Sequence, residues 1–178
     1  FQRLLEENWV LGGEPSGHII CLDAAQTGDA IIAGLKLLDS LKDNDFNLAL
    51  DILNGKNILV TGGTGSFGQR FCQLVLNRFN LKKLIVLSRD EHKQYIMQRS
   101  PVFQDRDEIR FFIGDIRDTE RLRMAMRNVD YVVHAAAMKH VPITEYNPLE
   151  CIHTNVHGAE NIVSAAMYCG VERVLALS

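Results

Sequence analysis

The sequence predicts an α/β protein built on a Rossmann-type, doubly wound parallel sheet, incomplete within these 178 residues and preceded by a short α/β fragment. The first observation is the order strand, glycine turn, helix: the apolar run at residues 57–60 leads into TGGTGSFG and then into a segment of helical periodicity. The second is that short apolar strands alternate with helical patterns from Lys56 onward, which implies right-handed crossovers and helices on both faces of the sheet. A ligand of such a sheet lies across the carboxyl ends of its strands.

Four more strands are predicted by short apolar runs. They lie at residues 83–87, 109–113, 131–134 and 173–177. The helical patterns between the strands predict helices at residues 66–79, 91–98, 119–127 and 149–168. Gly170 is expected to cap the last helix at its carboxyl end, and Asp118 suits the amino-terminal cap of the third.

The part of the chain before the glycine turn is short and polar. Residues 1–41 predict a loop from Gly12 to His18, a strand at 19–22 and a helix at 27–41, which is too little to fold unaided without disulfides. Residues 42–55 are rich in Asp and Asn and indicate a linker or an added edge of the next domain. We therefore predict three parts, at residues 1–41, 42–55 and 56–178.

Composition limits the classes of function. The chain is 47% hydrophobic and 7% aromatic, with a formal net charge of -3, as in an ordinary α/β protein. There is no basic surplus to indicate nucleic acid, no apolar stretch long enough to span a membrane and no signal-peptide layout, so we expect a cytoplasmic protein. The four cysteines show no CxxC spacing and are expected to be reduced and mostly buried.

The glycine turn predicts a dinucleotide site. Gly62 suits a tight turn, Gly65 allows a diphosphate to approach the backbone, and Gly68 allows the helix to pack on the strand. The start of the helix then offers free N–H groups and a positive dipole end to an anion. The alternative is a purely structural strand-to-helix turn. The predicted cofactor residues here are Gly62, Thr64, Gly65, Ser66, Phe67 and Gly68.

The end of the second strand bears on the choice of cofactor. An acidic side chain such as Asp90 would bind the adenosine ribose of NAD, whereas Ser88 and Arg89 suit the 2′-phosphate of NADP. Arg89 can also stack on adenine, and Lys93 adds a positive charge, so we favour NADP. The alternative is a solvated charge cluster that opens a helix.

The segment after the fourth strand predicts the other side of the site. Ala135, Ala136 and Ala137 are small enough for the backbone to pass close to the nicotinamide ribose and diphosphate, although an alanine run also suits close helix packing. Lys139 suits a cofactor hydroxyl or a sugar-nucleotide oxygen, and His140 suits the sugar pocket unless it is a structural hydrogen bonder. His153 and His157 have the spacing of a metal pair, but no third ligand is evident and no metal site is predicted.

Five segments together resemble the amino-terminal half of inverting UDP-N-acetylglucosamine 4,6-dehydratases, which belong to the extended short-chain dehydrogenase/reductase superfamily. They are NGKNILVTGGTGSFG, LIVLSRDEHKQ, FFIGDIRD, HAAAMKHVPITEYNPLECIHTN and RVLALS, within about residues 53–178. The resemblance implies NADP, UDP-N-acetylglucosamine as substrate, a homo-oligomer and a role in surface polysaccharide or flagellin glycan synthesis. It also implies that Asp115 accepts a hydrogen bond from the adenine amino group and that the backbone N–H of Ile116 contacts the ring. Asn155 would support the catalytic region from a kinked helix, or be an ordinary polar helix position.

The same resemblance locates the catalytic Thr-Asp-Lys and Tyr-x-x-x-Lys of the family after the fifth strand. In the family the tyrosine removes the sugar 4-hydroxyl proton as hydride passes to NADP, water leaves from C6, and the hydride returns to C6 with C5 inverted. None of the four tyrosines of this chain has a lysine four residues later. We therefore expect these 178 residues alone to be inactive, and a non-catalytic NADP-binding module is the competing hypothesis.

The first part of the chain resembles another family. The string LGGEPSGHIICLDAAQTGDAIIAGLKLL is similar to the sugar-binding loop, strand and helix in the third domain of phosphohexomutases, closest to phosphoglucosamine mutases. The resemblance implies that Glu14 and Ser16 hold sugar hydroxyls, with His18 nearby. A polar surface turn is the alternative. The chain contains neither the phosphoserine loop nor the metal-binding aspartate loop of that family, so we expect this segment to be catalytically inert.

Overall fold

The computed structural model describes residues 11–13, 19–21 and 53–177, and the chain divides into two compact units, Phe1–Asp51 with Ser178 and Ile52–Leu177. In the first unit, β1 (Leu11–Gly13) pairs antiparallel with β2 (Ile19–Cys21). The predicted strand is confirmed over three residues. Gly12 and Gly13, predicted in a loop, belong instead to β1, because ladder pairing uses backbone groups that glycine also has. The predicted helix at 27–41 and the residues Glu14, Ser16 and His18 lie outside the described part.

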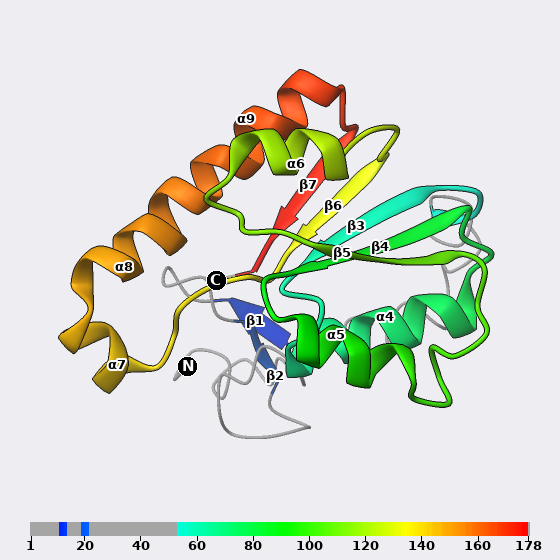
Figure 1. Ribbon diagram of the computed structural model, residues 1–178, viewed down its shortest axis with the longest axis horizontal. Helices are drawn as coiled ribbons and strands as arrows, with labels where there is room; N and C mark the ends of the chain where they lie inside the picture. Colours follow the sequence, from blue (N-terminus) through cyan, green and yellow to red (C-terminus); the bar gives the residue numbers. More distant parts are fainter. Residues whose placement is uncertain (1–10, 14–18, 22–52, 178) are drawn as a thin grey trace. The chain divides into compact units, whose positions relative to one another are not determined.

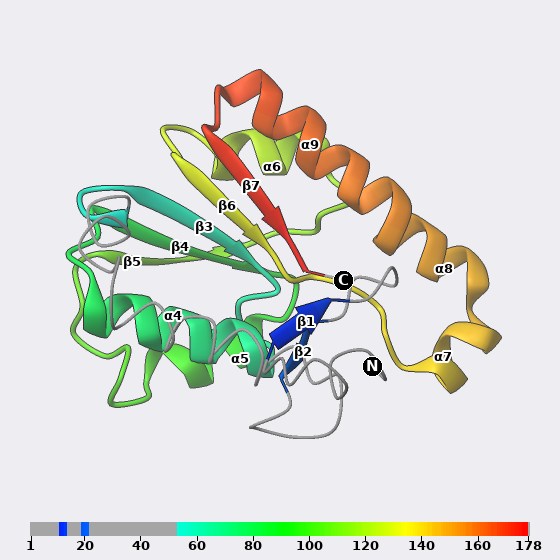
Figure 2. The ribbon, with the colours of Figure 1, turned by 180° about the vertical axis from the view of Figure 1, so that it is seen from behind.

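The second unit contains a five-stranded parallel sheet in the order β5-β4-β3-β6-β7. All five strands were predicted, to within one residue at each end. Figures 1 and 2 show α4 and α5 on one face and α6 and α9 on the other. The strands are β3 (Asn57–Thr61), β4 (Lys83–Ser88), β5 (Ile109–Ile113), β6 (Tyr131–His134) and β7 (Arg173–Ala176). The helices are α4 (Ser66–Arg78), α5 (Glu91–Gln98), α6 (Thr119–Ala125), α7 (Val141–Tyr146), α8 (Pro148–Ile152), the π-helix η1 (His153–His157) and α9 (Gly158–Cys169).

Strand alternation divides the core between the two faces of this sheet. On β3, Ile58 and Val60 point toward the α4 side, where Cys72 and Val75 are buried, and Leu59 points toward the opposite side. Leu122 of α6 and Ile162 of α9 cover that second side. The middle of β3, Ile58 to Val60, is apolar because a parallel sheet is buried on both faces.

The cysteines follow the prediction in part. Burial raises the pKa of the Cys72 thiol to about 12, so this thiol is not reactive. Cys151 and Cys169 are also reduced but only half-buried. Of the three cysteines whose side chains are described, one is therefore buried as expected.

The connection after β6 differs most from the prediction. The expected helix at 149–168 is present but consists of α8, η1 and α9 in sequence, and a further helix, α7, was missed. Gly170 ends α9 in the left-handed conformation with φ 70°, which confirms the predicted cap. Asp118 likewise caps α6 by accepting a hydrogen bond from the Arg121 amide. Within the described ranges, no helix has the length and apolar character needed to cross a membrane.

Candidate functional site

A cleft of about 610 Å³ lies at the carboxyl ends of the parallel strands. Every residue predicted to bind the cofactor lines it except Asp115, which stands between the lining residues Gly114 and Ile116. His140 also lines the cleft, whereas Asn155 does not. The lining residues not predicted from the sequence are Leu87, Gly114, Met138, Ile143, Thr144 and Thr154.

The glycine turn is packed too closely to admit side chains at two positions. Gly62 has φ +67°, and a Cβ there would lie 2.8 Å from the Ala135 carbonyl carbon and oxygen. A Cβ on Gly68 would lie 2.5 Å from the Gly62 oxygen and the Gly63 Cα. The helix at Gly68 therefore packs closely against the backbone of the turn. This contact fixes the start of α4 relative to the loop.

The amino-terminal end of α4 suits an anion. Its N-cap is Gly65, which makes no side-chain capping bond, and the first turn carries no acidic residue. The Gly65 amide donates to the Gly62 carbonyl over 2.9 Å, which closes the turn. The helix dipole and the first-turn N–H groups thus meet no local carboxylate that would compete with a bound phosphate.

A buried hydrogen bond lies directly beneath this turn. The Thr61 hydroxyl and His134 Nδ1, at the ends of β3 and β6, share a hydrogen bond of 2.7 Å. Both residues are buried, and burial lowers the pKa of His134 from its ordinary value. His134 is therefore a neutral imidazole that joins the two strands whose following loops, at Gly62 and Ala135, meet above it. Sequence reasoning placed His134 in a strand without giving it a role.

The residues at the end of β4 that were predicted to bind the 2′-phosphate or the ribose have different environments. Asp90 caps α5 by accepting a bond of 2.9 Å from the Lys93 amide, and this bond lowers the pKa of its carboxyl group. Ser88 is buried, and its hydroxyl accepts a bond of 3.0 Å from Gln94. The side chains of Arg89 and Lys93 are 55% and 62% exposed at the cleft. Asp90 lines the cleft together with Arg89 and Lys93, but its Oδ1 caps the helix and its Oδ2 lies 3.7 Å from Lys93 Nζ, so both of its oxygens already have partners.

Asp115 is held by its neighbours. Its Oδ1 accepts from the Arg117 amide over 2.9 Å, and its Oδ2 accepts from Arg117 Nε and Nη2 over 3.0 and 2.8 Å. Burial alone would raise the pKa of this carboxyl group, but the hydrogen bonds and charge of Arg117 hold the pKa below its usual range. Asp115 is consequently an ionised acceptor at the edge of the cleft.

Asn155 supports the cleft without lining it. Its Oδ1 accepts from the Met138 amide, and its Nδ2 donates to the Met138 carbonyl, both over 2.8 Å. These two hydrogen bonds to the backbone of one residue order the loop that carries Lys139 and His140. Both of those side chains are exposed at the cleft. Asn155 lies in the π-helix η1, from which its side chain reaches the backbone of Met138.

Thr154 is the clearest functional candidate that sequence reasoning missed. It lines the cleft and is 5% exposed, yet its Oγ1 has no hydrogen-bond partner among the described residues. A buried hydroxyl without a partner is unfavourable unless a ligand or water supplies one. The only signal in the sequence was its place beside Asn155. The predicted histidine pair, His153 and His157, has ring centroids 5.5 Å apart, and the described residues contain no group of three or more metal-ligating side chains.

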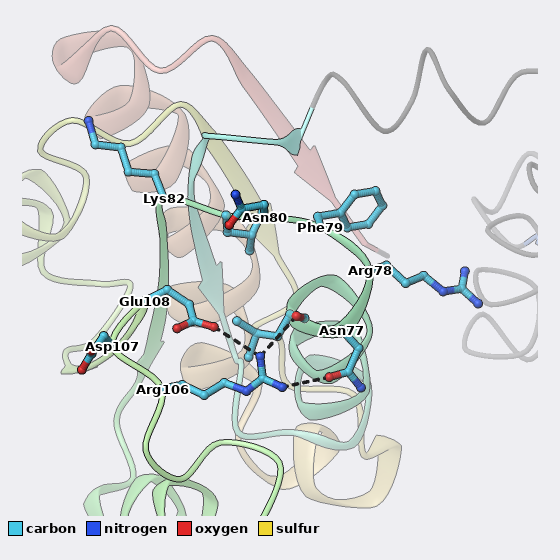
Figure 3. Close-up of a pocket in the computed structure, with 10 residues that line it drawn as sticks. Asn77, Arg78, Phe79, Asn80, Lys82, Arg106, Asp107 and Glu108 are labelled. Carbon is cyan, nitrogen blue, oxygen red and sulfur yellow. Dashed lines mark hydrogen bonds and ion pairs between the residues drawn. The ribbon is translucent and has the colours of Figure 1, made fainter.

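A second hollow, of about 630 Å³, lies away from these strand ends and is shown in Figure 3. Arg106 crosses it and donates to the Leu76 carbonyl, Asn77 Oδ1 and Glu108 Oε1 over 3.3, 3.0 and 3.2 Å. Its Nε donates to the Val102 carbonyl. Because the protein itself supplies partners for this guanidinium, Arg106 has a structural role: it connects the end of α4 to the segment before β5.

The fold defines a class, the Rossmann-like α/β proteins, and the solved structures similar to this chain include proteins of the short-chain dehydrogenase/reductase family. Pen from Bacillus thuringiensis is 43% identical with a TM-score of 0.66, covering 70% of this chain and 38% of that one. DesIV from Streptomyces venezuelae, a dTDP-glucose 4,6-dehydratase solved with NAD bound, is 31% identical with a TM-score of 0.57, covering 66% and 38%.

The chain belongs to the polysaccharide biosynthesis protein family, whose model matches residues 58–178. The inverting UDP-N-acetylglucosamine 4,6-dehydratase of Campylobacter jejuni is 55% identical over 127 residues, 71% of this chain. The chain spans only 37% of the length of that relative. Residues 1–53 match the alpha/beta/alpha domain III of phosphoglucomutases and phosphomannomutases. Both resemblances drawn from the sequence are thereby confirmed, and the chain is related to proteins that modify nucleotide sugars.

Proposed function

We propose that residues 56–178 form the NADP-binding part of a C5-inverting UDP-N-acetylglucosamine 4,6-dehydratase that acts in surface polysaccharide or flagellin glycan synthesis. The preceding residues would be a remnant of a phosphoglucosamine mutase. One observation carries the proposal: the glycine turn, the exposed Arg89 and Lys93, and the alanine segment all line a single cleft at the strand ends. The 55% identity to the Campylobacter jejuni dehydratase supports the substrate class.

The described residues fit a dinucleotide phosphate. The N–H groups in the first turn of α4 would bind the diphosphate, because no side chain caps that helix. Arg89 and Lys93 would bind the 2′-phosphate, since Asp90 is engaged as a helix cap. The unpartnered Thr154 hydroxyl supplies a buried polar contact on the same cleft. When bound, NADP would accept a hydride from the sugar and return it.

The remaining cleft residues would orient the sugar nucleotide. Lys139 would hold a cofactor or substrate oxygen, and His140 would line the sugar pocket. Asn155 would fix both residues through its two bonds to Met138. No Tyr-x-x-x-Lys occurs in the 178 residues, so the residues present would bind and orient the ligands but would not deprotonate the 4-hydroxyl.

The cofactor proposal is tested by calorimetric titration of the chain with NADP and with NAD. We expect tighter binding of NADP, and Arg89→Ala should weaken NADP by about 1.5–3 kcal/mol, the range for hydrogen bonds to charged groups, with little effect on NAD. Arg110→Ala is the matched control, because Arg110 is exposed and lies outside the cleft. Equal losses for both cofactors would show that Arg89 does not bind the 2′-phosphate.

The catalytic proposal has its own test. The purified chain is incubated with NADP and UDP-N-acetylglucosamine, and the 4-keto sugar is sought by mass loss of water. We expect no turnover, and clear turnover would mean that a residue such as Lys139 or His140 supplies the missing base. The competing hypothesis is a non-catalytic NADP-binding module. A full reading frame in which Thr-Asp-Lys and Tyr-x-x-x-Lys follow would instead support the enzyme.

A further inference from the structure

Two arginines, Arg89 and Arg117, contact the carboxylate of Asp115. Arg117 makes three hydrogen bonds to it, one through its backbone amide and two through its guanidinium. Arg89 makes only an ion-pair contact of 3.7 Å from Nη1 to Oδ2. Oδ2 therefore already accepts two short bonds from Arg117, and its capacity for a further short bond is used.

Arg117 is itself held in this position by the helices beyond it. Its Nη1 donates to Glu150 Oε2 over 2.7 Å, and its carbonyl accepts from Asn161 Nδ2 over 3.1 Å. The preceding residue, Ile116, also accepts from Asn161 and packs against Gly158, where a Cβ would lie 2.6 Å from Ile116 Cδ1. The loop from Asp115 to Arg117 is thus attached to α8 and α9, and the guanidinium cannot leave Asp115 without losing a second acid.

This arrangement decides which arginine remains available to a ligand. Arg89 lines the cleft, whereas neither Asp115 nor Arg117 does. Without the Arg117 side chain, Oδ2 would be free to accept the fork of Arg89, which is the stronger geometry for an arginine and a carboxylate. The unneutralised charge of Asp115 would also repel an anionic group in the cleft. Both effects oppose binding of a phosphate at Arg89.

We propose that Arg117 is a positioning residue for cofactor specificity: by occupying Asp115, it leaves the Arg89 guanidinium available for the 2′-phosphate of NADP. The inference rests on the proposed NADP site, and it adds a residue outside the cleft to that site. The adenosine, diphosphate and nicotinamide groups are common to NAD and NADP. The ratio of the two affinities therefore isolates the 2′-phosphate from the rest of the cofactor.

The test is calorimetric titration of the full 178-residue chain and its variants with NADP and NAD. Arg117→Met should lower the preference for NADP about tenfold, equivalent to about 1.4 kcal/mol. The double variant Asp115→Asn with Arg117→Met should recover most of the preference, since an amide no longer competes for Arg89. Arg110→Met is the matched control, because Arg110 is exposed and lies outside the cleft, and it should change the ratio by less than about twofold.

Each outcome has a separate meaning. An unchanged ratio in Arg117→Met, or a double variant no better than the single one, would overturn the inference, because a merely structural role of Arg117 predicts both. If Arg117→Met does not fold by circular dichroism, Asp115→Asn alone carries the test: it should keep or raise the preference for NADP, and a reduced preference would overturn the inference. A wild-type chain without preference for NADP would instead contradict the proposed cofactor.

Discussion

A methyl group at Gly65 should separate cofactor binding from folding. Gly65 has φ -74° and ψ 170°, a conformation open to any L-residue, and a Cβ there would lie 3.2 Å from the Gly62 oxygen. Replacing glycine by alanine at a compatible position stabilises a protein by about 0.4–1 kcal/mol through the unfolded chain. The tight contact with the Gly62 oxygen offsets part of this gain. We therefore expect Gly65→Ala to change the free energy of unfolding by less than about 1 kcal/mol.

The same methyl group would stand where the diphosphate approaches the backbone. Losing two hydrogen bonds to a charged group at about 1.5 kcal/mol each would weaken NADP at least about a hundredfold. Thermal unfolding followed by circular dichroism measures the first effect, and calorimetric titration with NADP measures the second. Wild-type affinity in a folded Gly65→Ala chain would refute the reasoning and leave the loop with a structural role only.

Gly68→Ala is the comparison variant. Its Cβ would lie 2.5 Å from backbone atoms of Gly62 and Gly63, which cannot rotate away as a side chain can. Overpacking of this kind destabilises by about 1–3 kcal/mol. Gly68→Ala should therefore lower the unfolding midpoint, in contrast to Gly65→Ala. Equal stability of the two variants would contradict the inference that Gly68 is packed more tightly than Gly65.

Two further predictions concern the supports of the cleft. Burial lowers the pKa of His134, so its contribution to stability is complete above the ordinary pKa of 6.5 and is lost as the pH falls through the folded-state pKa. His134→Gln should therefore flatten this part of a curve of unfolding free energy against pH. An unchanged slope would contradict the assignment of His134 as a buried neutral imidazole. Asn155→Ala should destabilise by about 1–2 kcal/mol and speed hydrogen exchange at the Met138 amide, whereas Asn161→Ala should leave that amide protected; equal protection in both variants would show that the Asn155 bonds are unimportant.

Local sequence signals were sufficient for most of the sheet and its helices. The strands at residues 109–113 and 131–134 were predicted to the residue, because short apolar runs between turns are typical of strands. The helix caps at Asp118 and Gly170 were also predicted, since each depends on the chemistry of a single residue. The glycine turn combined a periodic signal with the chemistry of single residues. Its predicted residues all line the cleft.

The misses are interactions between residues distant in sequence. Helix α7 begins near a proline, is six residues long and buries none of them, so it carries no periodic apolar face to detect. The Thr61–His134 bond joins residues 73 positions apart, and the Arg117–Glu150 bond joins residues 33 apart. Such pairs depend on side-chain direction in the folded chain, which neither propensity nor periodicity specifies. For the same reason, a cofactor contact was predicted for Asp115, but its hydrogen bonds to Arg117 were not.

Because η1 lies between α8 and α9, the number of residues in it determines which side chains of this helix face the cleft. The Gly158 amide donates to the His153 carbonyl, five residues earlier, so this turn holds one residue more than an α-helical turn. Deleting a single residue here would restore the α-helical spacing and rotate everything before it by about 100° relative to α9. Asn155 would then turn away from Met138, and Glu150 from Arg117. The chain should tolerate substitutions along this helix far better than single-residue insertions or deletions.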